Sequence, residues 1–150
     1  MRPFKTEIVL QTTWGRVWEL LADFSLYPQW HPLFPKVTGS GAAGDRHQLL
    51  VHLPGIDPFP VQVTLAAKAE GALSWQSTFL GRPFLAWTFS CRLEQVSPGS
   101  LKVLQHSEFH GVLAPLFRFA FSRSMEEGMA QLNLALRRWG EKGNVRCLRC

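Results

Sequence analysis

His106, Glu108 and His110 alternate along one short stretch of the sequence, and side chains of these types can hold a metal ion. Alternate residues of an extended strand share one face, so all three would point the same way. At about 3.3 Å per residue, the two imidazoles lie roughly 13 Å apart along a straight strand, too far to share one ion at about 2.1 Å without a bend. We therefore predict a solvated outer face here, with no metal and no cofactor.

His31 is a second candidate for chemistry, because it lies between Trp30 and Pro32 in a segment rich in proline. Its imidazole could hydrogen-bond a ligand or act as a base, but the sequence favours a role in ordering the loop. No phosphate-binding loop, dinucleotide-binding loop or nucleophile motif occurs. We therefore assign no catalytic residue and expect binding rather than catalysis.

The sequence has three cysteines, Cys91, Cys147 and Cys150. Their odd number, together with a start that does not resemble a secretory leader, favours a reducing, cytoplasmic environment. Cys91 lies in an apolar strand pattern and is expected to be an inert core thiol. Cys147 and Cys150 have the spacing of a redox pair but lack the strand and helix that such a site needs, so we expect no redox or zinc function for them.

The formal net charge is +5, and basic residues collect toward the C-terminus at Arg137, Arg138, Lys142, Arg146 and Arg149. Because no basic run occurs in the body of the chain, we do not expect nucleic acid as a partner. The basic tail could make weak contact with an anionic membrane surface. No run of about 18 apolar residues exists that could span a bilayer.

The order of the expected elements is informative. Segment 4–11 alternates as a strand, Thr12 or Thr13 can cap a following helix, and Asp23 can cap a second short helix. Strand patterns then recur, and in one of them Leu65 and Ala67 share a face. The remaining strand segments are 36–40, 46–53, 59–70, 73–79, 84–96 and 101–110. From 112 to 141 the apolar spacing becomes helical.

These elements predict an α+β fold of the helix-grip type. A curved antiparallel sheet of about seven strands would surround one long C-terminal helix, with two short helices after the first strand. We expect a single domain over residues 1–143, followed by the basic, cysteine-containing tail 144–150. A sheet that curves more than one helix can fill leaves a hollow, and the loop 52–58 could gate it.

The candidate ligand pocket consists mainly of aromatic and methionine side chains in the inward register. Six tryptophans and eleven phenylalanines are more than a core of this size needs, although large aromatic residues could equally form a solid core. Gln105 and Ser107 are the polar points that could orient a ligand. The candidates are Trp30, His31, Trp75, Phe79, Trp87, Phe89, Gln105, Ser107, Phe109, Phe117, Phe121, Met125 and Met129.

Three local motifs together resemble the SRPBCC superfamily, which includes START-like, pollen-allergen-like and polyketide-cyclase-like domains. The motifs are the helix and Tyr-Pro-x-Trp-x-Pro turn within 17–32, Leu73-Ser74-Trp75, and the strand-to-helix junction 108–113 followed by Pro115. The resemblance covers nearly the whole chain. It implies a helix-grip fold with a cavity under the last helix, and functions that range from lipid transfer and metabolite binding to aromatic cyclisation.

The chain departs from that pattern at positions where some relatives carry titratable groups. The inward register of the strand at 84–96 holds Trp87 and Phe89 rather than histidine, and the last strand offers Gln105 or Ser107 rather than glutamate. These differences favour the binding or transport of a hydrophobic small molecule such as a lipid, a polyketide or an aromatic compound. The alternative is a cyclase-like or dehydratase-like enzyme that would use His31, Gln105 and Ser107.

Overall fold

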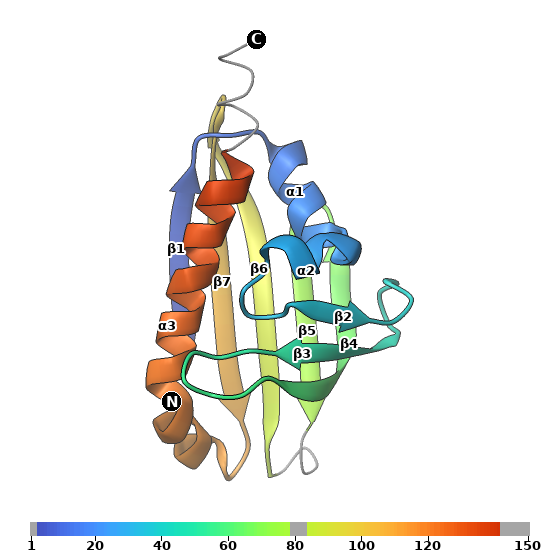
Figure 1. Cartoon of the computed structure of the whole chain (residues 1–150), viewed down its shortest axis with the longest axis vertical. Helices are drawn as coiled ribbons and strands as arrows, with labels where there is room; N and C mark the ends of the chain where they lie inside the picture. The colour runs from blue at the N-terminus through green and yellow to red at the C-terminus, as the bar shows by residue number, and fades with distance from the viewer. Residues whose placement is uncertain (1–2, 79–83, 142–150) are drawn as a thin grey trace.

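The computed structural model describes residues 3–78 and 84–141, and it consists of a strongly curved sheet with one long helix laid along it (Figure 1). The N-terminal elements are β1 (Phe4–Leu10), α1 (Trp14–Ala22), the short 3-10 helix η1 (Phe24–Leu26) and α2 (Tyr27–Trp30). The remaining elements are β2 (Lys36–Thr38), β3 (Arg46–Val51), β4 (Phe59–Ala69), β5 (Ala72–Thr78), β6 (Ala86–Ser97), β7 (Ser100–His110) and α3 (Ala114–Gly140). This order confirms the predicted helix-grip fold.

The sheet has seven strands in the order β1-β7-β6-β5-β4-β3-β2, and every neighbouring pair is antiparallel. Strands β2 to β6 therefore each pair with the next strand along the chain. The last strand, β7, also pairs with the first strand, β1. Directly opposite residues share a face of an antiparallel sheet. Trp87 lies opposite Phe109, and Phe89 lies opposite Ser107, so these four side chains are neighbours on the inner face.

The register of β4 corrects one prediction. A shift between Leu65 and Ala67 pairs Leu65 with Trp75 but Ala67 with Ser74. Because Ser74 and Trp75 point to opposite faces of β5, Ala67 does not share a face with Leu65. The bulge adds one residue to β4, which an alternating sequence pattern does not reveal.

The predicted caps begin the short helices. The side chain of Thr13 accepts a hydrogen bond from the backbone N–H of Arg16 at 3.3 Å, which starts α1. Asp23 Oδ1 accepts from the N–H of Ser25 at 3.1 Å, which starts η1. Both bonds satisfy donors that a helix leaves unpaired at its N-terminus. These helices cover the part of the sheet nearest to the end of α3 (Figure 1).

The end of α3 is fastened to the segment between β1 and α1. Thr12 Oγ1 donates to the carbonyl of Gly140 at 2.7 Å, and Arg16 donates to the carbonyl of Trp139 at 3.2 Å. Met129, Leu132 and Leu136 of this half of α3 are almost completely buried. Within residues 3–78 and 84–141, no helix is both long and apolar enough to cross a membrane. Phe79, Cys147 and Cys150, with the predicted tail 144–150, lie outside the described residues.

Candidate functional site

An apolar cavity of about 380 Å³ lies between the first half of α3 and the facing ends of β6 and β7. Its walls come from α3, from the β6–β7 pair and from the β3–β4 hairpin. The lining residues are Val51, Leu53, Phe59, Pro60, Leu85, Trp87, Phe109, Phe117, Phe121 and Met125. The volume falls within the range typical of small-molecule pockets, roughly 300–1,000 Å³. Pro60 is exposed and Phe117 and Phe121 are half-buried, so the cavity reaches the surface between α3 and the hairpin.

Three phenyl rings form one wall of the cavity. Phe117 and Phe121 are one helical turn apart, and their rings stack with centroids 6.0 Å apart. The ring of Phe109 on β7 lies 6.4 Å from each of them. Helical spacing and strand register therefore bring the three side chains together from two elements. Further along α3, Ser124 Oγ donates to the carbonyl of Pro54 at 3.0 Å, which ties the predicted gating loop 52–58 to the helix.

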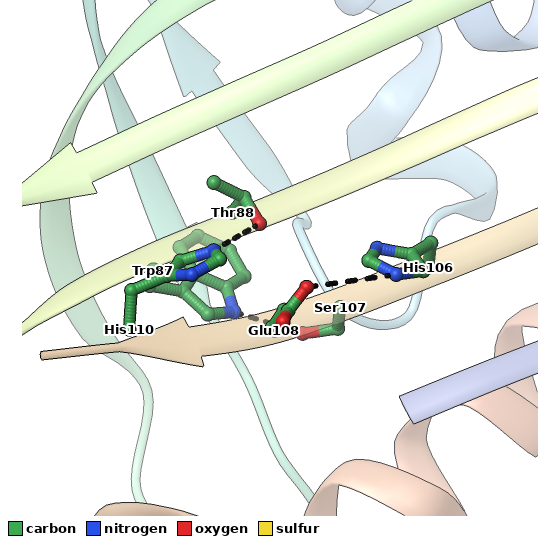
Figure 2. Close-up of polar contacts among 6 residues, drawn as sticks. All are labelled: Trp87, Thr88, His106, Ser107, Glu108 and His110. Carbon is green, nitrogen blue, oxygen red and sulfur yellow. Dashed lines mark hydrogen bonds and ion pairs between the residues drawn. The ribbon is translucent and has the colours of Figure 1, made fainter. Parts of the chain in front are cut away.

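The cavity walls offer almost no polar atoms. Among the ten lining residues, Trp87 has the only polar side-chain atom, its indole nitrogen. Figure 2 shows that this nitrogen points to Ser107, and it donates to Ser107 Oγ at 2.9 Å. The donor is therefore already satisfied by the protein. Binding in such a cavity depends on apolar surface and shape rather than on charge.

The structure divides the predicted pocket residues into two groups. Trp87, Phe109, Phe117, Phe121 and Met125 line the cavity. The other described candidates are buried elsewhere beneath α3 and the short helices: Trp30, His31, Trp75, Phe89, Gln105, Ser107 and Met129. The sequence pattern therefore predicted which side chains of each element point into the interior. It did not distinguish the side chains around the cavity from those in the filled part of the interior.

The filled part is organised around Phe34, which the sequence analysis missed. The ring of His31 stacks on Phe34 with a centroid distance of 5.0 Å, and Phe89 meets Phe34 edge-on at 5.0 Å. Trp75 packs instead between Phe24, at 5.1 Å, and His47, at 5.5 Å. These rings fill this part of the interior. The aromatic residues here therefore form a solid core, an alternative that the aromatic content of the sequence had left open.

His31 is a buried, neutral imidazole in this cluster. Its Nδ1 accepts a hydrogen bond from the backbone N–H of Phe34 at 3.0 Å. Burial lowers the pKa of His31 from its usual 6.5 to about 3, because the charged form would lose its hydration. The side chain holds the turn between residues 31 and 34 and does not line the cavity. Burial likewise raises the pKa of the free Cys91 thiol to about 12, which makes the thiolate inaccessible at neutral pH.

The predicted polar points join elements to one another. The amide nitrogen of Gln105 donates to the side-chain oxygen of Asn133, and the Asn133 nitrogen donates to Thr6 Oγ1 at 2.6 Å. This chain links β7, α3 and β1. Asn133 was also missed, although a polar residue on the apolar stripe of a helix is a signal that could have found it. Val51 in β3 and Leu85 directly before β6 also line the cavity, and the alternation of apolar residues in these segments could have identified them.

The triplet on β7 lies on the sheet face opposite to the cavity. Figure 2 shows His106 beside Glu108, at 3.7 Å, while His110 turns away to Thr88, with His110 Nε2 and Thr88 Oγ1 3.3 Å apart. In the part of the chain that the structure describes, no three histidine, cysteine or acidic side chains are close enough to hold a metal. The separation of the two imidazoles along a strand accounts for this arrangement.

Comparison with known structures shows the fold. An aromatase/cyclase, Zhui, from a Streptomyces species matches with a TM-score of 0.71 and 15% identity over 94% of each chain. A START superfamily protein from Mycobacterium smegmatis matches with a TM-score of 0.67 and 17% identity, over 93% of this chain and 97% of that one. Norcoclaurine synthase from Thalictrum flavum matches with a TM-score of 0.67 and 16% identity over 91% of each chain.

No curated protein sequence shows significant similarity to the chain. Residues 1–137, however, match the family described as polyketide cyclase / dehydrase and lipid transport. The match spans nearly all of the 150 residues, and the structural neighbours, which include an aromatase/cyclase and a START superfamily protein, share the fold of the chain. The resemblance to the SRPBCC superfamily is thus confirmed, and the chain belongs to the polyketide cyclase / dehydrase and lipid transport family.

Proposed function

We propose that the chain binds an apolar small molecule, such as a lipid, a polyketide or an aromatic compound, in the cavity under the first half of α3, and carries it. The observation that supports this most directly is the lining, in which the single polar side-chain atom is already bonded to Ser107. The family description names both lipid transport and polyketide chemistry. We also retain a cytoplasmic location as part of the proposal, since the free thiol of Cys91 suits a reducing compartment.

The chemistry of the lining sets the kind of selectivity to expect. A ligand that buries roughly 300 Å² of its apolar surface in the cavity would obtain about 7 kcal/mol of favourable binding free energy from the hydrophobic effect. The entropy cost of association opposes this term. No lining group is available to enforce one hydrogen-bonding pattern, so ligands of similar shape should compete with one another. Met125 adds to this tolerance because its unbranched thioether adapts to different shapes.

Filling the cavity tests the proposal. In Met125→Trp, an indole would occupy space that the ligand needs, so affinity should fall by about tenfold or more. Leu134→Trp is the matched control, because Leu134 is an exposed residue of the same helix and does not line the cavity. Affinity would be measured by fluorescence titration with an apolar dye and by its displacement with fatty acids and polycyclic aromatics. Equal affinities for the two variants, or no uptake of any such compound, would contradict the proposal.

A cyclase-like or dehydratase-like enzyme is the second candidate, favoured by the family description and by the fold shared with an aromatase/cyclase. Its candidate groups were His31, Gln105 and Ser107, and each makes a hydrogen bond within the protein. Turnover of a poly-β-keto substrate by the natural chain, lost on replacement of all three residues in folded protein, would support the enzyme. Unchanged turnover after all three replacements would exclude these residues as its machinery.

A further inference from the structure

The sheet has two edge strands that differ in length. The strand order places β2 at one edge and β1 at the other. β2 has only three residues, and short strands of this kind protect a sheet edge from pairing with another chain. β1 has seven residues and pairs with β7 without any shift in register. The free side of β1 is therefore a long, regular edge.

The neighbouring strands determine which backbone groups of β1 point away from the sheet. The N–H of Leu93 on β6 donates to the carbonyl of Gly71 at 2.8 Å, on the side away from β7. Antiparallel pairs alternate between those that exchange hydrogen bonds and those that do not. Val103, opposite Leu93, therefore bonds to β1, and Ile8, opposite Val103, bonds to β7. The residues on either side of Ile8 direct their backbone groups outward.

The outward backbone groups of β1 belong to Lys5, Glu7 and Val9. Arg137 on α3 donates to the carbonyl of Val9 at 3.3 Å, which agrees with this direction. Within residues 3–78 and 84–141, the backbone groups of Lys5 and Glu7 have no such partner, and the two side chains make no ion pair. All three side chains are exposed. A second strand can therefore reach hydrogen-bonding groups and charges that are not already engaged.

The residues along this edge are complementary to a second copy of themselves. Two copies related by a two-fold axis pair as antiparallel strands, and the outward groups of one strand must face those of the other. An axis at Thr6 places Lys5 of each copy opposite Glu7 of the other. An axis at Lys5 or at Glu7 would place like charges opposite each other, which is unfavourable.

The backbone groups of Val9 favour the same register. With the axis at the position that pairs the opposite charges, Val9 lies opposite Pro3 of the second copy. Proline has no N–H to donate to the Val9 carbonyl, which is the group that Arg137 already occupies. The Val9 N–H still donates to the Pro3 carbonyl. An axis at Ile8 would instead place Val9 opposite Glu7, whose N–H would compete with Arg137 for that carbonyl.

The flank of α3 beside β1 can accommodate a second copy. Asn133 and Arg137 bond to β1, and the exposed residues Glu126 and Ala130 lie on the same flank at helical spacing. α3 runs along β1 (Figure 1), so the two-fold axis brings the second α3 alongside in the opposite direction. The small side chain of Ala130 allows close approach, and Glu126 of one helix comes toward Arg137 of the other.

We propose that the chain forms a dimer through β1, with the two-fold axis at Thr6, so that the two sheets join into one continuous antiparallel sheet. Lys5 and Glu7 of opposite copies exchange backbone hydrogen bonds, and their side chains pair on the outer face. The described residues that line the cavity include none from β1, so the dimer leaves the cavity open. The dimer is independent of the proposed ligand binding, because it uses a different surface.

Sedimentation equilibrium of the full chain over a concentration series tests the dimer. The mass of the natural chain should rise from 17.0 kDa toward twice that value as the concentration increases. Lys5→Glu alone and Glu7→Lys alone each place like charges opposite each other, so each should raise the dissociation constant of the dimer by about tenfold or more. Lys36→Glu, on the opposite edge strand, is the matched control and should dimerise as the natural chain does.

An equimolar mixture of the two single variants tests the register itself. In the mixed dimer, glutamates at both positions of one copy face lysines at both positions of the other. The mixture should therefore dimerise more tightly than either variant alone. Amide exchange adds a backbone readout, because the N–H of Glu7 should exchange more slowly as the natural chain dimerises.

A natural chain that stays monomeric at millimolar concentration would overturn the proposed dimer. A dimer in which Lys5→Glu behaves like Lys36→Glu would also overturn it, because the interface would then lie elsewhere. A mixture that dimerises no better than its components would exclude the axis at Thr6. Dye binding in the cavity, measured in parallel, should be the same for Lys5→Glu and the natural chain, which separates failure of the dimer from failure of the proposed ligand binding.

Discussion

The two halves of α3 cover the same sheet but enclose different interiors. Beneath Met129 and Leu136 the space is filled, and a Cβ added at Gly140 would lie 3.5 Å from the side chains of Leu10 and Val17. Beneath Phe117 and Met125 the space is hollow. Helices α1 and α2 cover the sheet only on the filled side (Figure 1). The difference shows that an apolar helix face produces a core or a cavity according to which other elements reach it.

Gly128 lies on α3 between the two halves. A Cβ at this position would lie 2.5 Å from the buried Leu33 side chain and 3.4 Å from Leu53 and Pro54. The lack of a side chain thus lets the segments at 33 and 53 approach the helix closely. Leu53 also lines the cavity, so this contact forms its boundary on the side of the filled half.

Truncating two methionines of α3 should show the contrast most strongly. Met129→Ala removes a side chain that is packed on all sides and should lower the free energy of unfolding by about 2–5 kcal/mol. Met125→Ala should cost less, about 1–2 kcal/mol, because the side chain already lacks packing partners on the cavity side. Urea denaturation of both variants measures the difference. If Met125→Ala were the more destabilising, the volume beneath it would be occupied by protein contacts rather than hollow.

The filled half should also make stability depend on pH through His31. Its pKa is about 3 when folded and 6.5 when unfolded, so between these values protons bind the unfolded chain preferentially. The folded state therefore loses stability as the pH falls from 6.5 toward 3, by about 2 kcal/mol from this residue at pH 5. His31→Asn keeps an acceptor for the Phe34 N–H and cannot titrate.

Unfolding curves of the natural chain and of His31→Asn at pH 7 and pH 5 isolate this contribution. The variant should be less stable at pH 7 because it loses ring contacts, but its stability should fall less on acidification. Parallel losses in the two proteins would show that His31 is solvated and titrates with an ordinary pKa. No residue of the cavity lining is ionisable, so the hollow half should add nothing to this dependence.

The fold could be predicted because local patterns determined each element. The alternation of apolar and polar residues ends at His110, where β7 ends, and apolar residues at helical spacing begin within a few residues, where α3 begins. The sheet and the helix each have an apolar face, so the two faces were expected to pack together. The hollow could be predicted only in part. Periodicity shows that Phe89 and Trp87 both point inward, but not that Phe34 would contact both rings while Trp87 also borders the cavity. The path of the segment from Phe24 to Phe34 decides this, and its turns have no period.

The smallest expected effect concerns the hydrogen bond at the border of the two halves. Ser107 is completely buried, and its hydroxyl accepts from the indole of Trp87 (Figure 2). Trp87 is also one of the residues that line the cavity. Ser107→Ala leaves that donor unsatisfied. An unsatisfied buried donor costs about 1–3 kcal/mol, and the loss should be near 1 kcal/mol here because the indole borders a cavity that water can enter.

The same variant should change what the cavity binds. A free indole N–H next to the apolar space would favour ligands that carry a hydrogen-bond acceptor, so Ser107→Ala should bind a fatty alcohol or ketone better relative to the matching hydrocarbon. Ser77→Ala is the control, because Ser77 Oγ donates to the carbonyl of Gln62 at 2.7 Å and does not line the cavity. An unchanged preference in Ser107→Ala, with an unchanged stability, would mean that the indole nitrogen does not face the ligand. The cavity would then select ligands by shape alone in both proteins.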